Sequence, residues 1–218
     1  MSKRQPPLKA LLDRVDSDRP VIEGFLAQVR AVLEKTPEVS TVVHSYKARV
    51  KSRTSLGEKI SAKRKDGKFI DQTNIYRVIT DVAGVRLLHL FPKDIATIHH
   101  AIERVVQANG WVYRERPKAY SWDPESVSFL KGLGIRSTLK PSYYTSVHYV
   151  VMPNSKANVC CEIQVRTLFE EIWGEIEHKL KYKSGVVEKS TDEHLGVLAR
   201  LVAVGARVCD ALHKPNSE

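Results

Sequence analysis

Two acidic residues, Asp81 and Glu162, are placed where a protein can hold a metal ion. Asp81 heads the apolar stretch Ile79–Phe91, which predicts a buried strand that Gly84 interrupts, and Glu162 lies within a second predicted strand. Strict alternation would set Asp81 and Arg86 on opposite faces, so either Asp81 precedes the strand or Gly84 marks a bulge. Carboxylate oxygens are the ligands that Mg²⁺ prefers. Both acids are therefore candidate magnesium ligands, with a simple turn acid as the alternative for Asp81.

The strand that carries Glu162 runs directly into an amphipathic helix, within the stretch Val159–Lys183. Apolar and polar residues alternate along the strand, so its polar residues share one face. These polar residues are Glu162, Gln164 and Arg166. Thr167 caps the helix, which has an apolar stripe at helical spacing. A separate arc of this helix carries Glu171, Glu175 and His178. That arc either belongs to the site or forms a solvated acidic surface.

A basic stretch, His44–Lys68, precedes both acids and holds nine Lys or Arg residues against two acids. Ser52 or Ser55 can cap the helix that follows, and Ser55 lies one helical turn before Lys59. A helix N-terminus, a hydroxyl and a lysine can converge on a phosphate group. The cations that could meet a phosphorylated ligand are Arg49, Lys51, Lys59 and Arg86. The alternative is a solvated basic surface.

An aromatic residue with polar companions completes the set of residues that could do chemistry. Tyr143–Val151 predicts a strand with Tyr144 and His148 on one face, and the turn at Pro153–Asn158 predicts an antiparallel hairpin with the Glu162 strand. Phosphoryl-type transfer uses carboxylates for Mg²⁺, cations for the phosphates and a planar surface for a base. Composition and periodicity by themselves lead to a mixed α/β domain that binds a phosphorylated ligand.

The elements that must position these residues form a single predicted domain. Three further helices are predicted at Val21–Glu34, Pro92–Asn109 and Asp192–His213, and a strand at Trp111–Tyr120. Residues 121–140 contain Gly and Pro and predict a loop with a helical turn at 126–131. The predicted organisation is a loose basic arm at 1–20, the domain at 21–190, and a C-terminal helix at 191–218 that packs on the domain or on another subunit.

Composition limits the class of protein. The formal net charge of +10 favours a polyanionic partner such as nucleotide phosphates or RNA. The three cysteines, Cys160, Cys161 and Cys209, lack metal-site spacing and predict reduced packing residues. No signal peptide and no run of about 18 apolar residues is present. We therefore expect a soluble cytoplasmic protein without a membrane partner.

Four motifs in order resemble the synthetase domain of the RelA/SpoT family and cover residues 44–183. They are Arg49-Val-Lys51-Ser-x-x-Ser55-x-x-x-Lys59, Asp81-Val-Ala-Gly84-Val-Arg86, Tyr144-Thr-Ser146-Val-His148 and Glu162-Ile-Gln164-Val-Arg166-Thr167, followed by Trp173 and Glu177-His178. The resemblance implies an α/β fold of the nucleotidyltransferase type, with a mixed β-sheet flanked by α-helices in a single domain. It also implies transfer of the β,γ-pyrophosphate of ATP to the 3′-hydroxyl of GDP or GTP, making (p)ppGpp, with Mg²⁺ as the cofactor.

The resemblance also implies a role for each matched residue. Arg49 and Arg86 would sandwich the adenine of ATP, and Asp81 would bind Mg²⁺. Glu162 would share the metal or take the proton of the attacking hydroxyl. The ATP phosphates would be held by Lys51, Ser55 and Lys59. The acceptor would be held by Tyr144, which stacks on its base, together with His148, Gln164 and Arg166.

Two departures from the family pattern keep alternatives open. Ser142-Tyr143 stands where Asn-Gly is usual, and Trp173–Glu175 reads Trp-Gly-Glu where Trp-Ala is usual. Both resemble toxic small synthetases, some of which modify the 3′-end of tRNA or adenine nucleotides and have an antitoxin partner. A third interpretation is a non-catalytic nucleotide- or RNA-binding module. An N-terminal hydrolase domain is not expected, so the chain would only synthesise, and small synthetases often form homo-oligomers.

Overall fold

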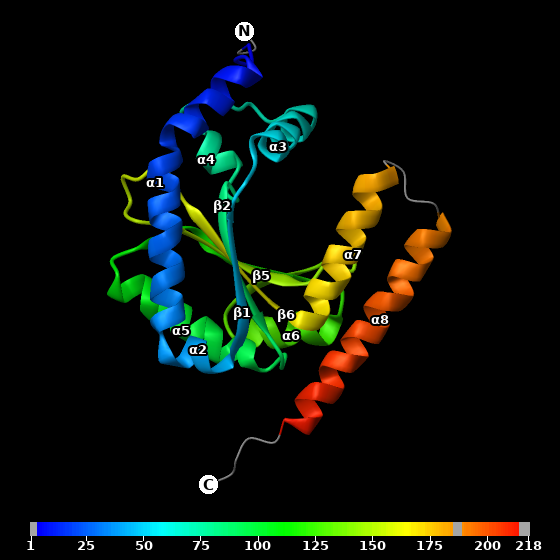
Figure 1. The fold of residues 1–218 in the computed structure, drawn as a ribbon. Coiled ribbons are helices and arrows are strands. Elements are labelled where there is room, and N and C mark those ends of the chain that lie inside the picture. Colours follow the sequence, from blue (N-terminus) through cyan, green and yellow to red (C-terminus); the bar gives the residue numbers. More distant parts are fainter. Residues whose placement is uncertain (1–3, 185–188, 214–218) are drawn as a thin grey trace.

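The computed structural model describes residues 4–184 and 189–213, and these form one mixed sheet with helices on both sides (Figure 1). The strands are β1 (Val43–Val50), β2 (Ala83–His89), β3 (Val112–Ser121), β4 (Arg136–Leu139), β5 (Ser146–Met152) and β6 (Cys161–Thr167). The helices are α1 (Leu8–Lys35), α2 (Pro37–Val42), α3 (Arg53–Lys65), α4 (Ile75–Val78), α5 (Asp94–Ala108), α6 (Pro124–Gly132), α7 (Leu168–Ser184) and α8 (Lys189–Leu212). The predicted fold class is confirmed.

The six strands follow the order β1-β2-β6-β5-β3-β4. β2 and β6 pair in parallel, and so do β3 and β4, whereas the other neighbours are antiparallel. The hairpin predicted between β5 and β6 is therefore confirmed. The strands that carry the sequence-predicted site residues lie next to one another in the centre and at one edge of the sheet.

Register decides which residues of these strands face each other. Gly84 of β2 pairs with Arg49 of β1 and with Glu162 of β6. Two residues further along, Arg86 pairs with Gln164, which in turn pairs with His148 of β5. Because side chains alternate between the two faces of a strand, these polar residues all project from the same face.

The other face of the sheet is apolar and forms the core with α1, α2 and α5, which lie together on that side (Figure 1). The central strands contribute Val85, Leu87, Val147, Tyr149, Ile163 and Val165, each no more than 4% exposed. A slip of one residue in register would turn these side chains to the opposite face. Burial of the apolar face therefore holds the polar face in register as well.

The predicted loose arm at residues 1–20 is wrong. α1 begins at Leu8 and continues through Pro20 to Lys35, and residues 1–3 lie outside the described part of the chain. Leu11 and Val15 are buried, because they extend the helical spacing of the apolar residues that follow Pro20. The first turns of this helix pack against α3, where Leu8 and Leu12 lie next to Gly57, so the arm belongs to the domain.

The segment 121–140 is more regular than its Gly and Pro content predicts. Asp123 caps α6 by accepting a hydrogen bond from the Ser126 backbone N–H at 3.2 Å, with Pro124 in the first turn. Gly134 then turns the chain at φ 79° into β4, which pairs with β3. A cap and an edge pairing thus order a segment that the sequence indicated to be mostly loop.

The predicted C-terminal helix is confirmed as α8, which lies alongside α7 on the far side of the sheet from α1 (Figure 1). Its inner residues Leu195, Gly196, Ala199 and Ala206 are buried. Its outer apolar residues Val197, Leu201, Val204, Val208 and Leu212 are at least 50% exposed. Packing on a second subunit stays a prediction, and residues 185–188 and 214–218 lie outside the described part.

The structure shows the state of the three cysteines. Cys160 and Cys161 are buried free thiols, and Cys209 is a partly buried one. Within residues 4–184 and 189–213, no helix combines the length and apolar character needed to cross a bilayer.

Candidate active site

The polar face of the sheet opens into a cavity of about 230 Å³. Its lining comes from β1, β2 and β6, from the residues before β2, and from α7. The lining residues are Lys47, Ala48, Arg49, Asp81, Gly84, Val85, Arg86, Glu162, Gln164 and Glu175. Of the residues that the sequence predicted to bind ATP or metal, Arg49, Asp81, Arg86 and Glu162 therefore meet here. Gly84 also lines the cavity, and a Cβ there would lie only 3.3 Å from the Glu162 carbonyl oxygen, which favours glycine at this position.

Asp81 precedes β2, which decides between the two placements that the sequence left open. Its Oδ2 accepts from Lys59 Nζ at 2.6 Å and lies 3.0 Å from Lys51 Nζ. Its Oδ1 is buried and has no hydrogen-bond partner among the described residues. Burial would raise the pKa of Asp81, but the charges and hydrogen bonds of Lys59 and Lys51 outweigh it and lower that pKa. Asp81 is thus an ionised carboxylate with one oxygen unused.

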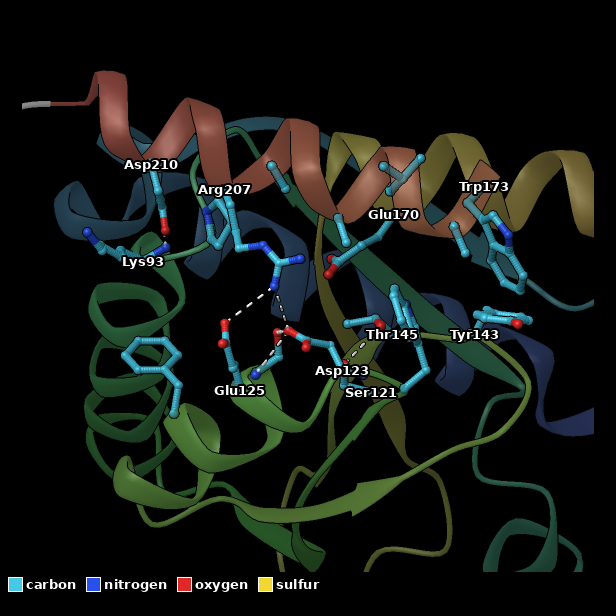
Figure 2. Close-up of a pocket in the computed structure, with 18 residues that line it drawn as sticks. Lys93, Ser121, Asp123, Glu125, Tyr143, Thr145, Glu170, Trp173, Arg207 and Asp210 are labelled. Carbon is cyan, nitrogen blue, oxygen red and sulfur yellow. Dashed lines mark hydrogen bonds and ion pairs between the residues drawn. The ribbon is translucent and has the colours of Figure 1, made fainter. Parts of the chain in front are cut away.

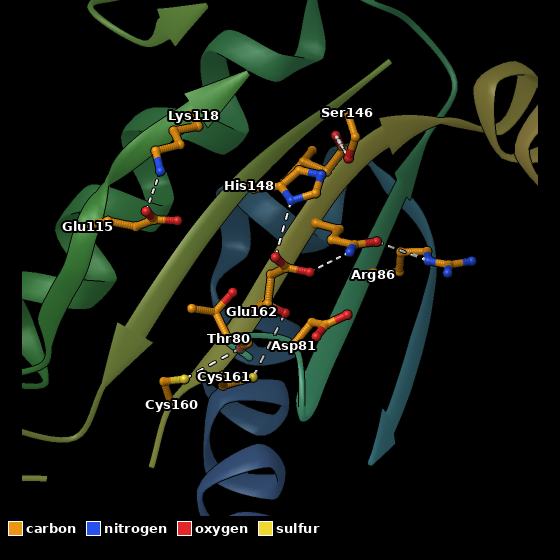
Figure 3. Close-up of polar contacts among 12 residues, drawn as sticks. Thr80, Asp81, Arg86, Glu115, Lys118, Ser146, His148, Cys160, Cys161 and Glu162 are labelled. Atoms are coloured by element: carbon orange, nitrogen blue, oxygen red, sulfur yellow. Dashed lines mark hydrogen bonds and ion pairs between the residues drawn. The ribbon is translucent and has the colours of Figure 1, made fainter. Parts of the chain in front are cut away.

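Glu162 is 7% exposed and is held by two neighbours on the same face. Its Oε1 lies 3.2 Å from His148 Nδ1, and its Oε2 accepts from Gln164 Nε2. Figure 3 shows the His148 ring pointing at the Glu162 carboxylate, with Asp81 beside it. Burial raises the pKa of Glu162, but the hydrogen bond and charge of His148 outweigh this and the net pKa is lowered. The carboxylate is therefore ionised and oriented.

The residues predicted to hold an acceptor also come together. Tyr144 Oη lies 2.9 Å from His148 Nε2, and the Arg166 guanidinium carbon lies 6.0 Å from the centre of the Tyr144 ring. The ring of Tyr120 contacts both Tyr144 and His148. Lys140 Nζ lies 4.9 Å from the centre of the Tyr120 ring, so a cation borders this aromatic group. His148 contacts both Tyr144 and Glu162, so it connects the aromatic group to the Glu162 carboxylate.

Ser55 is a predicted ATP-binding residue that, within the described part of the chain, neither lines the cavity nor forms a hydrogen bond with Asp81. It lies in the first turn of α3, where its backbone N–H donates to the Ser52 Oγ cap at 3.2 Å. Lys59, one turn further along α3, does reach Asp81. α3 thus places Lys59 against Asp81, while the hydroxyl groups of Ser52 and Ser55 lie at the helix N-terminus.

The acidic arc of α7 is part of the site, and the alternative of a solvated surface is wrong for Glu171. Its side chain is 5% exposed and contacts Lys47 Nζ at 2.7 Å, Arg86 Nη1 at 2.8 Å and Arg166 Nη2 at 2.6 Å. Glu175, one turn on, lies 3.0 Å from Arg86 Nη1. Burial raises the pKa of Glu171, but these three cations outweigh it and lower that pKa.

Sequence reasoning missed Lys47 and the central part that Glu171 plays. Both left a signal. Lys47 precedes Arg49 by two positions on β1, so it shares the face of Arg49. Glu171 and Glu175 are one helical turn apart, and an acidic pair of this kind opposite a strand of cations favours an ion-pair network.

The Trp-Gly-Glu departure has a steric explanation. A Cβ at Gly174 would lie 2.8 Å from Arg166 Nη1, closer than a Cβ atom approaches a non-bonded heavy atom. The missing methyl group lets the Arg166 guanidinium lie against α7 and reach Glu171.

Comparison with known proteins agrees with the fold and the motif order. Residues 48–186 match the family described as the region found in RelA / SpoT proteins. Over 158 residues the chain is 30% identical to GTP pyrophosphokinase YwaC of Bacillus subtilis (strain 168), a match that covers 69% of this chain and 65% of YwaC, just under two thirds of that relative.

Solved structures share the fold. The small alarmone synthetase 1 of Bacillus subtilis bound to its product pppGpp superposes with a TM-score of 0.65 at 19% identity, covering 94% of this chain and 96% of that one. A GTP pyrophosphokinase family protein from Streptococcus pneumoniae gives a TM-score of 0.65 at 20% identity, covering 92% and 91%. The family match, which takes in the cavity residues from Arg49 to Glu175, shows that the chain belongs to the RelA/SpoT family.

Proposed function

We propose that this chain is an ATP-dependent pyrophosphokinase of the GTP diphosphokinase type, which makes (p)ppGpp from GDP or GTP. The observation that carries the proposal is the cavity in which Asp81 and Glu162 meet a ring of cations beside Tyr144. The name of its relative YwaC, a GTP pyrophosphokinase, supports the same substrate class.

In the proposed reaction, the acceptor's 3′-oxygen attacks the β-phosphorus of ATP. The bond from that phosphorus to the α,β-bridging oxygen breaks, AMP leaves, and the hydroxyl proton passes to the Glu162 carboxylate. Lys51 and Lys59 would neutralise the phosphates, and Arg49 with Arg86 would hold the adenine. Since little covalent chemistry is required of the protein, positioning and charge neutralisation would supply most of the rate.

The residues at the cavity fit a magnesium ion. The buried Oδ1 of Asp81 lacks a partner among the described residues, and Glu162 lines the same cavity. Asp81 and Glu162 line the same cavity, so the two carboxylates face a common space. When bound there, Mg²⁺ would neutralise phosphate charge. Asp81 and Glu162 are the residues that would hold it.

Asp81→Asn tests the metal assignment. The amide keeps the shape but loses the charge, so we expect the Mg²⁺ concentration for half-maximal activity to rise by about tenfold to hundredfold, in the range seen when metal sites lose supporting groups. The measurement is initial rate against Mg²⁺ at saturating ATP. An unchanged Mg²⁺ dependence would remove Asp81 from the metal site.

Tyr144→Ala tests whether the Tyr144 ring stacks on the base of the acceptor. A lost base stack costs about 1–3 kcal/mol of binding free energy. We therefore expect the acceptor KM to rise by the factor that corresponds to this energy, while the KM for ATP stays the same. His148→Asn, which keeps the ring of Tyr144, separates stacking from the hydrogen bond at 2.9 Å. An acceptor KM equal to that of the unmodified protein would count against stacking.

A second acceptor, the 3′-end of tRNA, is favoured by specific observations. The net charge of +10 exceeds what one nucleotide requires. Lys140 lies over Tyr120 beside the acceptor residues, and Tyr143 replaces the glycine usual in the family. A chain with this activity would block translation and would need an antitoxin partner to restrain it.

The deciding experiment supplies γ-labelled ATP with GDP, GTP, AMP, ATP or deacylated tRNA, each with Mg²⁺ and with excess chelator. We expect label on GDP or GTP in the presence of Mg²⁺ alone. Label on tRNA or on adenine nucleotides would replace the proposed acceptor but keep the pyrophosphokinase reaction. Binding of ATP without label on any acceptor would favour a non-catalytic binding module.

A further inference from the structure

Tyr143, the residue directly before Tyr144, has an unusual backbone. Its φ is 57°, and among the described residues it is the only non-glycine residue with a positive φ. A bulky side chain rarely adopts this conformation, which glycine adopts freely. Residues 143–145 also precede β5 and lie outside any strand pairing. The backbone here must therefore be held by something other than the sheet.

The side chain of Tyr143 is seated against α8. A Cβ built at Gly196 would lie 2.9 Å from Tyr143 Oη and 3.1 Å from its Cζ, so the ring packs where a larger residue would stand. The ring also meets Trp122 and Trp173 edge-on, with centroids 5.4 and 6.4 Å away. Trp173 in turn donates from Nε1 to the Leu195 carbonyl of α8 at 3.0 Å.

Figure 2 shows Tyr143 below Trp173 at one end of the cavity between α8 and the sheet. α8 is fastened at the other end of this cavity as well. There Arg207 lies 3.5 Å from Asp123, and Asp210 accepts from the Lys93 backbone N–H at 3.2 Å. The helix that receives the Tyr143 ring is thus anchored to the domain at both ends of the contact.

We infer that Tyr143 is a positioning residue, which uses its seat at Gly196 to hold Tyr144 in place for the acceptor. This inference rests on the proposed function. Only His148 separates Tyr144 from the Glu162 carboxylate. Tyr144 Oη lies 2.9 Å from His148 Nε2, and His148 Nδ1 lies 3.2 Å from Glu162 Oε1. A movement of α8 at Gly196 would therefore displace Tyr144 and, through His148, the Glu162 carboxylate.

The chain offers a matched control on the same helix. At Gly205 a Cβ would lie 3.0 Å from Cε1 of Phe169, a contact as close as that between Gly196 and Tyr143. Gly205 is far from the Tyr143 turn along α8, and Phe169 has no part in the site. Gly196→Ala and Gly205→Ala thus introduce the same methyl group against an aromatic ring, and only Gly196→Ala presses on the residue before Tyr144.

The experiment compares both variants by steady-state kinetics and by amide hydrogen exchange. In Gly196→Ala we expect the acceptor KM to rise by about tenfold to hundredfold, as a misplacement of about 1 Å can cause, with the KM for ATP unchanged. We also expect faster exchange over residues 142–148. In Gly205→Ala we expect neither change. The same acceptor KM and the same exchange in both variants would overturn the inference.

Tyr143→Gly provides a second test that does not depend on a steric clash. Glycine suits a φ of 57° but lacks the ring, so the turn can form while its attachment to α8 is lost. We expect faster exchange over residues 142–148 and a raised acceptor KM. Exchange there equal to that of the unmodified protein would refute the positioning role. The exchange readout decides this even if no acceptor is labelled, so failure of the proposed function remains distinguishable.

Discussion

Glu162→Gln is expected to lower kcat for pyrophosphate transfer by about 10²–10⁴-fold, the usual range for a general base, while ATP binding is retained. The amide is the same size as the carboxylate and can keep a contact to Gln164, but it cannot accept the acceptor's proton. Because Glu162 is only 7% exposed, water has little access to replace it as the base. The measurements are initial rates at saturating substrates and ATP titration of the variant.

The control for this prediction is Glu23→Gln. Glu23 is an exposed acid on α1 that pairs with Arg19 at 2.8 Å, remote from the cavity. It changes the net charge of the chain by the same amount, so a non-specific electrostatic effect would appear in both variants. A kcat for Glu162→Gln close to that of Glu23→Gln would exclude Glu162 from proton transfer.

Glu171→Gln is expected to lower the free energy of unfolding by about 3–5 kcal/mol, the cost of breaking a buried ion pair from one side. The substitution leaves Arg166, which is 5% exposed, as a buried charge without its carboxylate. It also removes the shared partner of Lys47 and Arg86. Urea unfolding at neutral pH measures the change.

A control variant and the pH dependence test this prediction for Glu171→Gln further. Glu175→Gln, one helical turn away, removes a carboxylate that is 46% exposed and whose ion pair within the described part of the chain is with Arg86, so its cost should be about 0–1 kcal/mol. The pKa of Glu171 in the folded state is lowered below its ordinary value of 4.5, so its stabilisation is present above that pH. The difference between Glu171→Gln and the unmodified protein should therefore shrink as pH falls below about 4.5. Equal costs for the two variants, or a difference independent of pH, would contradict the role of Glu171.

Both predictions concern one connected set of charges. Glu171 holds Arg86 on the side of the cavity assigned to ATP and Arg166 on the side assigned to the acceptor. α7 thus ties the two halves of the proposed site together by a single buried carboxylate. This arrangement accounts for a carboxylate placed in a helix that packs on the sheet, where an apolar residue would otherwise be expected.

Much of the site was predictable because strand periodicity is a local property. Alternation along β6 placed Glu162, Gln164 and Arg166 on one face, and the structure confirms that face. The cap at Thr167 was equally local, and its Oγ1 accepts from the Glu170 backbone N–H at 3.2 Å. The order of the four motifs then indicated the family, which the matched region 48–186 confirms.

The errors arose where local signals compete. Residues 1–20 were predicted to form a loose basic arm, yet the apolar spacing on both sides of Pro20 continues one helix. Glycine and proline in 121–140 suggested a loop, yet the Asp123 cap and pairing with β3 order it. In each place packing against the rest of the domain outweighs the residue preference, which is worth at most a few kcal/mol.

By itself the sequence determined strands β2, β3, β5 and β6, the polar faces of β5 and β6, and the membership of the family, because each depends on patterns within short stretches of the chain. Only the tertiary structure decided that Lys47, 124 positions before Glu171, meets it at 2.7 Å, and that Tyr143 rests on Gly196. Such contacts depend on strand order and on which helix covers which face. Those are settled by burial of the whole apolar surface, and no short stretch of sequence contains them.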